Sequence, residues 1–172
     1  RKIVTAGKPV IASTGGLMIH EIDNLYSYLT HRLSHVAILH CLSVYPAPED
    51  KLNLSVIRTM ISRYPDVIIG YSGHEEPENV DIIKAAVTLG ARIYERHVGL
   101  PTEKVKLNSY SLDPEQTDKW VKAAIRAKKA LGEPEKTADD EERKSLFLLK
   151  RGVFASHGLR KGEMIKPEDV FF

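Results

Sequence analysis

The sequence contains a single cysteine, Cys41, among its 172 residues. One cysteine excludes an intrachain disulfide framework and favours a reducing compartment, so we expect a cytoplasmic protein. No apolar run reaches the roughly 18 residues of a membrane span, and no signal-peptide pattern opens the chain, so we expect no membrane association. The net charge is only +2, and basic and acidic residues share the same predicted helices, which argues against nucleic-acid binding.

The sequence also lacks the GxGxxG and P-loop motifs of nucleotide-binding α/β proteins. It has instead a regular alternation of short apolar runs and amphipathic segments. The apolar runs predict buried strands at 8–12, 35–39, 67–69 and 91–95. The intervening segments predict helices at 19–30, 52–63, 76–89 and 114–131, the last with Asp113 as its N-cap. This pattern predicts an α/β fold with parallel strands, either the last four βα units of a (β/α)8 TIM barrel or a small doubly wound sheet.

The chain divides by composition into three parts. Residues 1–132 carry the four βα units, and the segment up to Gly7 is interpreted as the end of a helix, which suggests a fragment of a longer barrel. Residues 133–150 are polar and acid-rich and are interpreted as a linker. Residues 151–172 predict the start of a small β-rich module, with strands at 151–155 and within 158–165 and a helical turn at 166–169.

Two of the predicted strands belong to stretches of the same form that end in a histidine. In Asp66-Val-Ile-Ile-Gly-Tyr-Ser-Gly-His74, residues 67–69 are expected to be buried on both faces, and Gly70 and Gly73 to turn the chain where the strand stops. Ala91-Arg-Ile-Tyr-Glu-Arg-His97 has the same form. Because the carboxyl ends of parallel strands meet at one edge, His74 and His97 are predicted to hold one metal ion.

Glu95 lies two residues before His97 and therefore points to the same face of its strand. It could bind the metal, hold a metal-bound water or act as a base. A mixed shell of imidazole, carboxylate and water suits Mn, Fe or Zn, and the residues alone do not choose among them. The alternative is that both histidines are ordinary residues at strand ends.

Hydroxyl groups are expected at the same edge of the sheet. Ser13 and Ser72 lie in short loops of small residues, which bind phosphate or carboxylate well but are equally typical of simple turns. Ser43 and Tyr45 alternate after the second strand, so both are expected at the mouth of the barrel, where Tyr45 either binds substrate or packs. Cys41 is expected to be buried, because no general base stands beside it in the sequence.

Six segments, in this order, together resemble the N-acetylneuraminate (sialic acid) synthase family. They are Lys8-Pro-Val-Ile-Ala-Ser-Thr-Gly15, His40-Cys-Leu-Ser-Val-Tyr-Pro46, Ile69-Gly-Tyr-Ser-Gly-His74, Glu95-Arg-His97, Ser111-Leu-Asp-Pro114 and Arg160-Lys-Gly-Glu163. The resemblance implies a TIM barrel followed by an antifreeze-like (SAF) domain, in a domain-swapped homodimer. It implies that phosphoenolpyruvate condenses with an N-acetylated amino sugar, N-acetylmannosamine or a relative, and that phosphate is released.

The resemblance also implies roles for individual residues. His74 and His97 match the ligands of a divalent metal, Mn or Mg, and Glu95 matches the carboxylate beside them. Tyr45, Ser13, Ser43 and Ser72 match residues that line the pocket for phosphoenolpyruvate and sugar.

The sequence departs from the family pattern at two points. Leu107 stands where the family has an Asp, and leucine can neither ionise nor form a hydrogen bond. The strands that carry the early glutamate and the phosphoenolpyruvate lysines are absent, and so is an arginine of the SAF domain, so we expect this segment alone to be inactive.

Two alternatives to a synthase therefore stay open. One is a non-catalytic or divergent relative that binds a sugar or an anion, for example in surface or spore-coat polysaccharide synthesis. The other is a different metal aldolase of the phosphoenolpyruvate-using barrels, such as a 3-deoxy-heptulosonate synthase, which the ordered motifs and the SAF-like tail disfavour.

Overall fold

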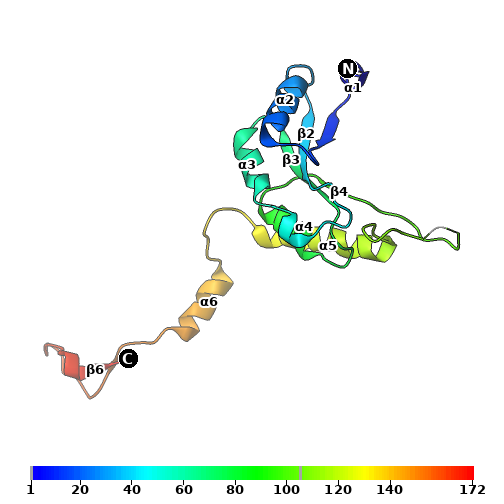
Figure 1. Ribbon diagram of the computed structural model, residues 1–172. Coiled ribbons are helices and arrows are strands. Elements are labelled where there is room, and N and C mark those ends of the chain that lie inside the picture. The colour runs from blue at the N-terminus through cyan, green and yellow to red at the C-terminus, as the bar shows by residue number, and fades with distance from the viewer. Residues whose placement is uncertain (1, 105) are drawn as a thin grey trace. The chain divides into compact units, whose positions relative to one another are not determined.

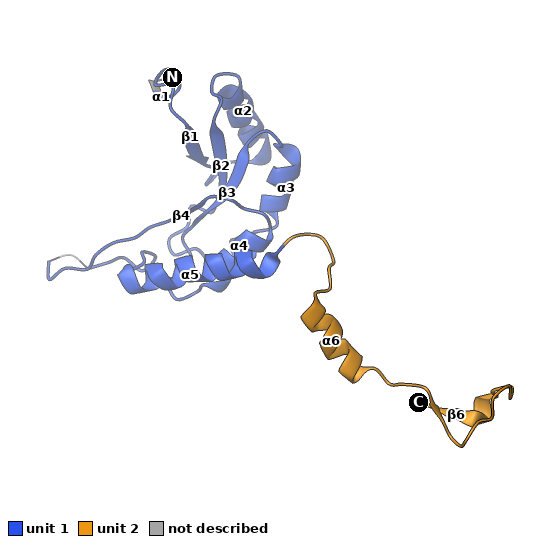
Figure 2. Ribbon diagram, turned by 180° about the vertical axis from the view of Figure 1, so that it is seen from behind, with its two compact units in different colours: residues 1–132 blue, residues 133–172 orange. Residues whose placement is uncertain are grey.

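The computed structural model describes residues 2–104 and 106–172, so Arg1, in the predicted end of a helix, lies outside the described residues. The chain forms two compact units, residues 1–132 and residues 133–172 (Figure 2). Within the described part of the chain, no helix is both long and apolar enough to cross a membrane.

The first unit is built on four parallel strands in the order β1-β2-β3-β4 (Figure 1). The strands are β1 (Val10–Ser13), β2 (Val36–Cys41), β3 (Ile68–Gly73) and β4 (Tyr94–Arg96). The helices and helical turns are α1 (Lys2–Thr5), α2 (Ile19–Thr30), η1 (Glu49–Lys51), α3 (Val56–Arg63), α4 (Asp81–Thr88) and α5 (Pro114–Leu131). The predicted α/β class with a parallel sheet is confirmed, and α2 and α5 have their predicted bounds.

One face of the sheet is covered by helices. Ile38 of β2 and Ile69 of β3 pack with Ile57 and Met60 of α3 in the main core, and Ile22 of α2 joins them. The helices that follow β1 and β2 turn their apolar faces to this core, so they pack against the same face of the sheet. A second, smaller core joins α4 to α5.

The other face of the sheet is concave and open at the strands' amino ends. Ile11 of β1 is 56% exposed and Ile68 of β3 is 41% exposed. The prediction that residues 67–69 are buried on both faces is therefore wrong for Ile68, because no described element covers this side. Ser13 and Glu95 belong to the two outer strands, β1 and β4, yet their side-chain oxygens lie 3.5 Å apart. In a flat sheet these strands would be about 14 Å apart, so the sheet is curled.

Gly70 lies inside β3 instead of at its end, so the turn predicted there is wrong, and the strand continues to Gly73. A Cβ on Gly70 would lie 2.4 Å from the Ile93 carbonyl oxygen and 2.3 Å from Leu39 Cδ2. Glycine is needed here because the backbone of the next strand comes too close for a side chain.

The second unit contains α6 (Asp140–Leu149), β5 (Phe154–Ala155), the helical turn η2 (Pro167–Asp169) and β6 (Val170–Phe171). The predicted linker is therefore helical in its second half, where Asp139 caps α6 by accepting a hydrogen bond from the Glu142 amide at 2.7 Å. The strand predicted within 158–165 is not found, and β5 pairs with β6 instead. The helical turn is confirmed, and assignment of this unit to an SAF domain stays a prediction.

We predict that Gly70→Ala lowers the free energy of unfolding by about 1–3 kcal/mol, because the added methyl collides with the fixed Ile93 carbonyl. Gly99→Ala is the matched control, since its methyl would meet only the movable tip of Leu107 and should change stability by less than about 0.5 kcal/mol. Urea unfolding followed by circular dichroism measures both. Equal stability of the two variants would contradict the steric account.

Candidate functional site

The carboxyl ends of β1, β3 and β4 bring two hydroxyls to one carboxylate. Ser72 is the neighbour of Glu95 in the β3–β4 register, so both side chains lie on the concave face. The Ser72 hydroxyl donates a hydrogen bond to Glu95 Oε1 at 2.7 Å, and the Ser13 hydroxyl lies 3.5 Å from the same oxygen. Glu95 Oε2 makes no hydrogen bond within the described residues, so this oxygen is available to a ligand.

His74 and His97 come together beside this cluster, as the sequence predicts. Their ring centroids are 5.1 Å apart. His74 is 4% exposed, and its Nδ1 lies 3.1 Å from the Leu42 carbonyl oxygen. A carbonyl only accepts, so Nδ1 carries the proton and Nε2 keeps its lone pair. Burial lowers the pKa of His74, which favours the neutral imidazole.

Two tyrosines complete the wall around the histidines. The Tyr45 ring lies 4.3 Å from the His74 ring, and the Tyr110 ring lies 5.2 Å from the His97 ring. The two tyrosine rings are 5.0 Å apart. Tyr45 was expected at the mouth of the barrel and lies beside the metal-ligand candidates, whereas Tyr110 was missed by the sequence analysis.

Tyr110 reaches the site because the irregular segment after β4 closes on itself. Val98 and Leu112 form an isolated parallel bridge. The Leu112 amide donates to the His97 carbonyl and the Gly99 amide donates to the Leu112 carbonyl, each at 2.9 Å. No local periodicity signals this closure, and the only available hint was that Tyr110 directly precedes the Ser111-Leu-Asp-Pro114 motif.

Ser43 and Cys41 lie at the edge of the same region. A Cβ on Gly15 would overlap Ser43 Oγ at 2.0 Å, which shows how closely the loop after β1 approaches Ser43. Cys41 is the register partner of Ser72, and burial raises the pKa of its thiol. His40 is half-buried with Nε2 2.7 Å from the Leu52 carbonyl oxygen, so it has a structural role.

A buried ion pair lies behind the histidines and was also missed. Arg96 Nη1 and Glu75 Oε2 are 2.6 Å apart, and the two side chains are 2% and 1% exposed. The Tyr71 hydroxyl donates to the same Glu75 oxygen at 2.9 Å, and Arg96 also donates to the Glu75 carbonyl. Each member of the pair directly neighbours a histidine in the chain, so the pair ties the ends of β3 and β4 together.

Two residues at this edge, His74 and His97, are of a type that commonly binds metal ions. Among residues 2–104 and 106–172, no group of three or more His, Cys, Asp or Glu side chains is placed to hold a metal ion, so Glu95 does not join the histidines as a third ligand. Two imidazole rings whose centroids are 5.1 Å apart nevertheless suit one ion whose remaining positions are filled by water and substrate oxygens. The two histidines thus fit a hydrated divalent ion rather than a closed structural site.

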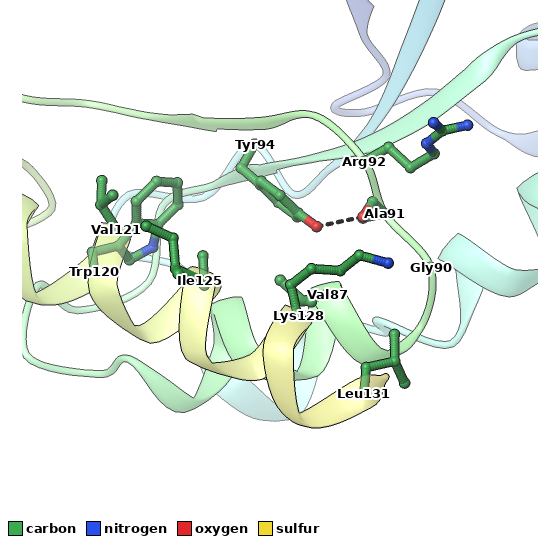
Figure 3. A pocket seen from close by; sticks show the side chains of 11 residues that line it. Val87, Gly90, Ala91, Arg92, Tyr94, Trp120, Val121, Ile125, Lys128 and Leu131 are labelled. Atoms are coloured by element: carbon green, nitrogen blue, oxygen red, sulfur yellow. Dashed lines mark hydrogen bonds between the residues drawn. The ribbon is translucent and has the colours of Figure 1, made fainter. Parts of the chain in front are cut away.

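A hollow lies on the helix side of the sheet, and its lining includes neither His74 nor His97. This pocket of about 640 Å³ is formed by α4, α5 and the chain leading into β4 (Figure 3). Its lining is mostly apolar, including Val87, Trp120 and Ile125. An apolar lining between helices is typical of a packing surface, and it offers no cluster of nucleophiles or metal ligands.

The comparisons with known proteins agree on one family. The model of the NeuB family matches residues 1–136. The human N-acetylneuraminate-9-phosphate synthase is 35% identical over 136 residues, which cover 78% of this chain and 37% of the human protein. The N,N'-diacetyllegionaminic acid synthase of Campylobacter jejuni is 28% identical over 179 residues, covering 99% of this chain and 51% of that protein.

A solved structure extends the likeness to the fold. The crystal structure of N-acetylneuraminic acid (sialic acid) synthetase from Leptospira borgpetersenii, in complex with citrate, matches with a TM-score of 0.74 and 31% identity. The match covers 85% of this chain and 50% of that chain. The chain thus spans about half the length of these relatives or less.

We predict that Glu75→Leu and Arg96→Met each lower the free energy of unfolding by about 3–5 kcal/mol, because each leaves an unpaired buried charge. The double variant should be much less destabilised than the sum of the two. The exposed pair Asp81–Lys84 is the matched control, and its double-mutant cycle should show a coupling of less than about 0.5 kcal/mol. Additive effects of Glu75→Leu and Arg96→Met would contradict the coupling.

Proposed function

The chain belongs to the NeuB family, and we propose that it is part of a nonulosonic acid synthase that condenses phosphoenolpyruvate with an N-acetylated amino sugar. N-acetylmannosamine or a relative is the proposed aldehyde. Carbon 3 of phosphoenolpyruvate bonds to the aldehyde carbon, water adds to carbon 2, and phosphate leaves. The observation that carries the proposal is the pair of histidines beside the Ser13–Ser72–Glu95 cluster, at the carboxyl ends of parallel strands.

His74 and His97 are the proposed ligands of a divalent ion, Mn or Mg. Such an ion, when bound, acts as a Lewis acid on the aldehyde oxygen. The hydrogen bond between His74 Nδ1 and the Leu42 carbonyl would hold the ring in place and leave Nε2 as the nitrogen that binds the ion.

Glu95 is proposed as the base that accepts a proton from the water that adds to carbon 2. Ser72 holds Oε1, which leaves Oε2 for that proton. Tyr45, which is 49% exposed next to His74, is proposed to hydrogen-bond the substrate. Ser13, Ser43 and Ser72 are proposed to bind substrate oxygens around the carboxylate. Unit 2 is proposed to begin an SAF domain, in a domain-swapped homodimer.

A non-catalytic relative that binds a sugar or an anion is the second candidate. Leu107 favours it, because its side chain carries no polar group and lies against Gly99. The pair of histidines and the Glu95 cluster favour the synthase, because the carboxyl-end edge of the sheet would not need these side chains if its role were only structural.

We predict that the full-length protein releases phosphate from phosphoenolpyruvate in a Mn-dependent reaction with an N-acetylated amino sugar. Glu95→Gln should lower kcat by about 10²–10⁴-fold with unchanged metal content, because the base is lost and the side-chain volume is kept. Glu103→Gln, at an exposed position, is the control. Sugar binding without phosphate release in the wild type would support the non-catalytic relative instead.

We also predict that His74→Ala and His97→Ala each weaken Mn²⁺ binding by more than about 100-fold. Loss of a residue that only supports a metal ligand typically weakens metal binding by about 10–100-fold, and loss of the ligand itself should weaken it more. His20→Ala, at an exposed position, should leave the affinity unchanged. Calorimetric titration of the full-length protein with MnCl₂ measures all three variants. Wild-type affinity in either strand-end variant would remove that histidine from the site.

A further inference from the structure

We infer that Tyr110 is a sugar-binding residue of this site, whose hydroxyl contacts a hydroxyl or N-acetyl oxygen of the amino sugar. The inference rests on the proposed function and adds a residue that neither the motifs nor the family resemblance assigns. It starts from the segment between β4 and α5, in which Leu107 cannot form hydrogen bonds.

Tyr110 is the residue of this segment that contacts both histidines. Its ring lies 5.2 Å from His97 and 6.4 Å from His74, and it is nearly perpendicular to both. It is half-buried, and its hydroxyl makes no hydrogen bond within the described residues. The phenol is therefore held at the site with an unused donor and acceptor.

Three neighbours of Tyr110 in the segment, Leu107, Asn108 and Ser111, have contacts of their own. Asn108 Oδ1 accepts a hydrogen bond from the Tyr110 amide at 3.2 Å, which fixes the backbone that carries the ring. Ser111 is 7% exposed and lies next to the buried Leu112. Leu107 Cδ2 packs 2.5 Å from the position that a Cβ on Gly99 would take. Tyr110 thus differs from these neighbours in lying against both histidines with its hydroxyl unused.

The chemistry of the pair Tyr45–Tyr110 suits a sugar better than phosphoenolpyruvate. Their rings are 5.0 Å apart and tilted by 55°, so they offer an apolar wall to the C–H groups of a sugar and two hydroxyls to its oxygens. A neutral phenol does not compensate the charges of a phosphorylated acid, which cationic groups and backbone amides bind more strongly. Tyr110 should therefore affect the sugar and not phosphoenolpyruvate.

The test compares Tyr110→Phe with wild type in the full-length protein loaded with Mn²⁺. We expect the KM for N-acetylmannosamine, or for the amino sugar of a panel that the enzyme uses, to rise by about 10-fold, as for the loss of one hydrogen bond. The KM for phosphoenolpyruvate and the metal content should stay within about twofold of wild type. Calorimetric binding of the sugar alone should weaken by the same factor as the KM.

A control variant separates a direct role from a general effect of removing a tyrosine hydroxyl. Tyr28→Phe, which removes a hydroxyl from a surface tyrosine beside Arg32, should change neither KM.

The outcomes distinguish the two levels of the proposal. If the wild type is active and Tyr110→Phe binds and uses the sugar normally, the proposed role of Tyr110 is wrong and the proposed synthase activity is still supported. A wild type that binds the sugar without turnover overturns the synthase, and weaker binding by Tyr110→Phe then still supports the role of Tyr110. No sugar binding and no turnover in wild type overturn both.

Discussion

The curl of the parallel sheet is the constraint on which the candidate site depends. Ser13 and Glu95 come from the two outer strands of four, and their side-chain oxygens are 3.5 Å apart only because the concave face folds toward itself. Parallel pairing then places Cys41, Ser72 and Glu95 level with one another. Gly70 allows β3 and the chain entering β4 to approach closely, because a side chain there would strike the Ile93 carbonyl. Backbone geometry therefore assembles the carboxylate cluster without help from a long loop.

The histidines need a second constraint, since each lies one residue beyond the end of its strand. The buried Glu75–Arg96 pair provides it by joining the residue after His74 to the residue before His97. Buried charges are costly when unpaired, so each holds the other in place. The polar edge of the sheet thus carries the two histidines and, next to each of them in the chain, one member of the buried ion pair.

Much of this arrangement follows from the sequence, because parallel strands have a fixed polarity. The buried runs predicted the four strands, and strand ends predicted that His74, His97, Ser13 and Ser72 would share one edge. The rest depends on contacts that periodicity does not encode. Tyr110 arrives through a closure of the chain by the Val98–Leu112 bridge. The exposure of Ile68 depends on what covers the concave face, and the function of Gly70 depends on a neighbour 23 residues away, Ile93.

The central claim is that His74 and His97 bind the same metal ion. Electron spin echo spectroscopy of Mn²⁺ bound to the full-length protein tests it most directly, because it detects the imidazole nitrogens coordinated to the ion. The account predicts two such nitrogens in wild type, and one after substitution of either histidine. A spectrum without coordinated imidazole, or one unchanged by either substitution, would contradict it.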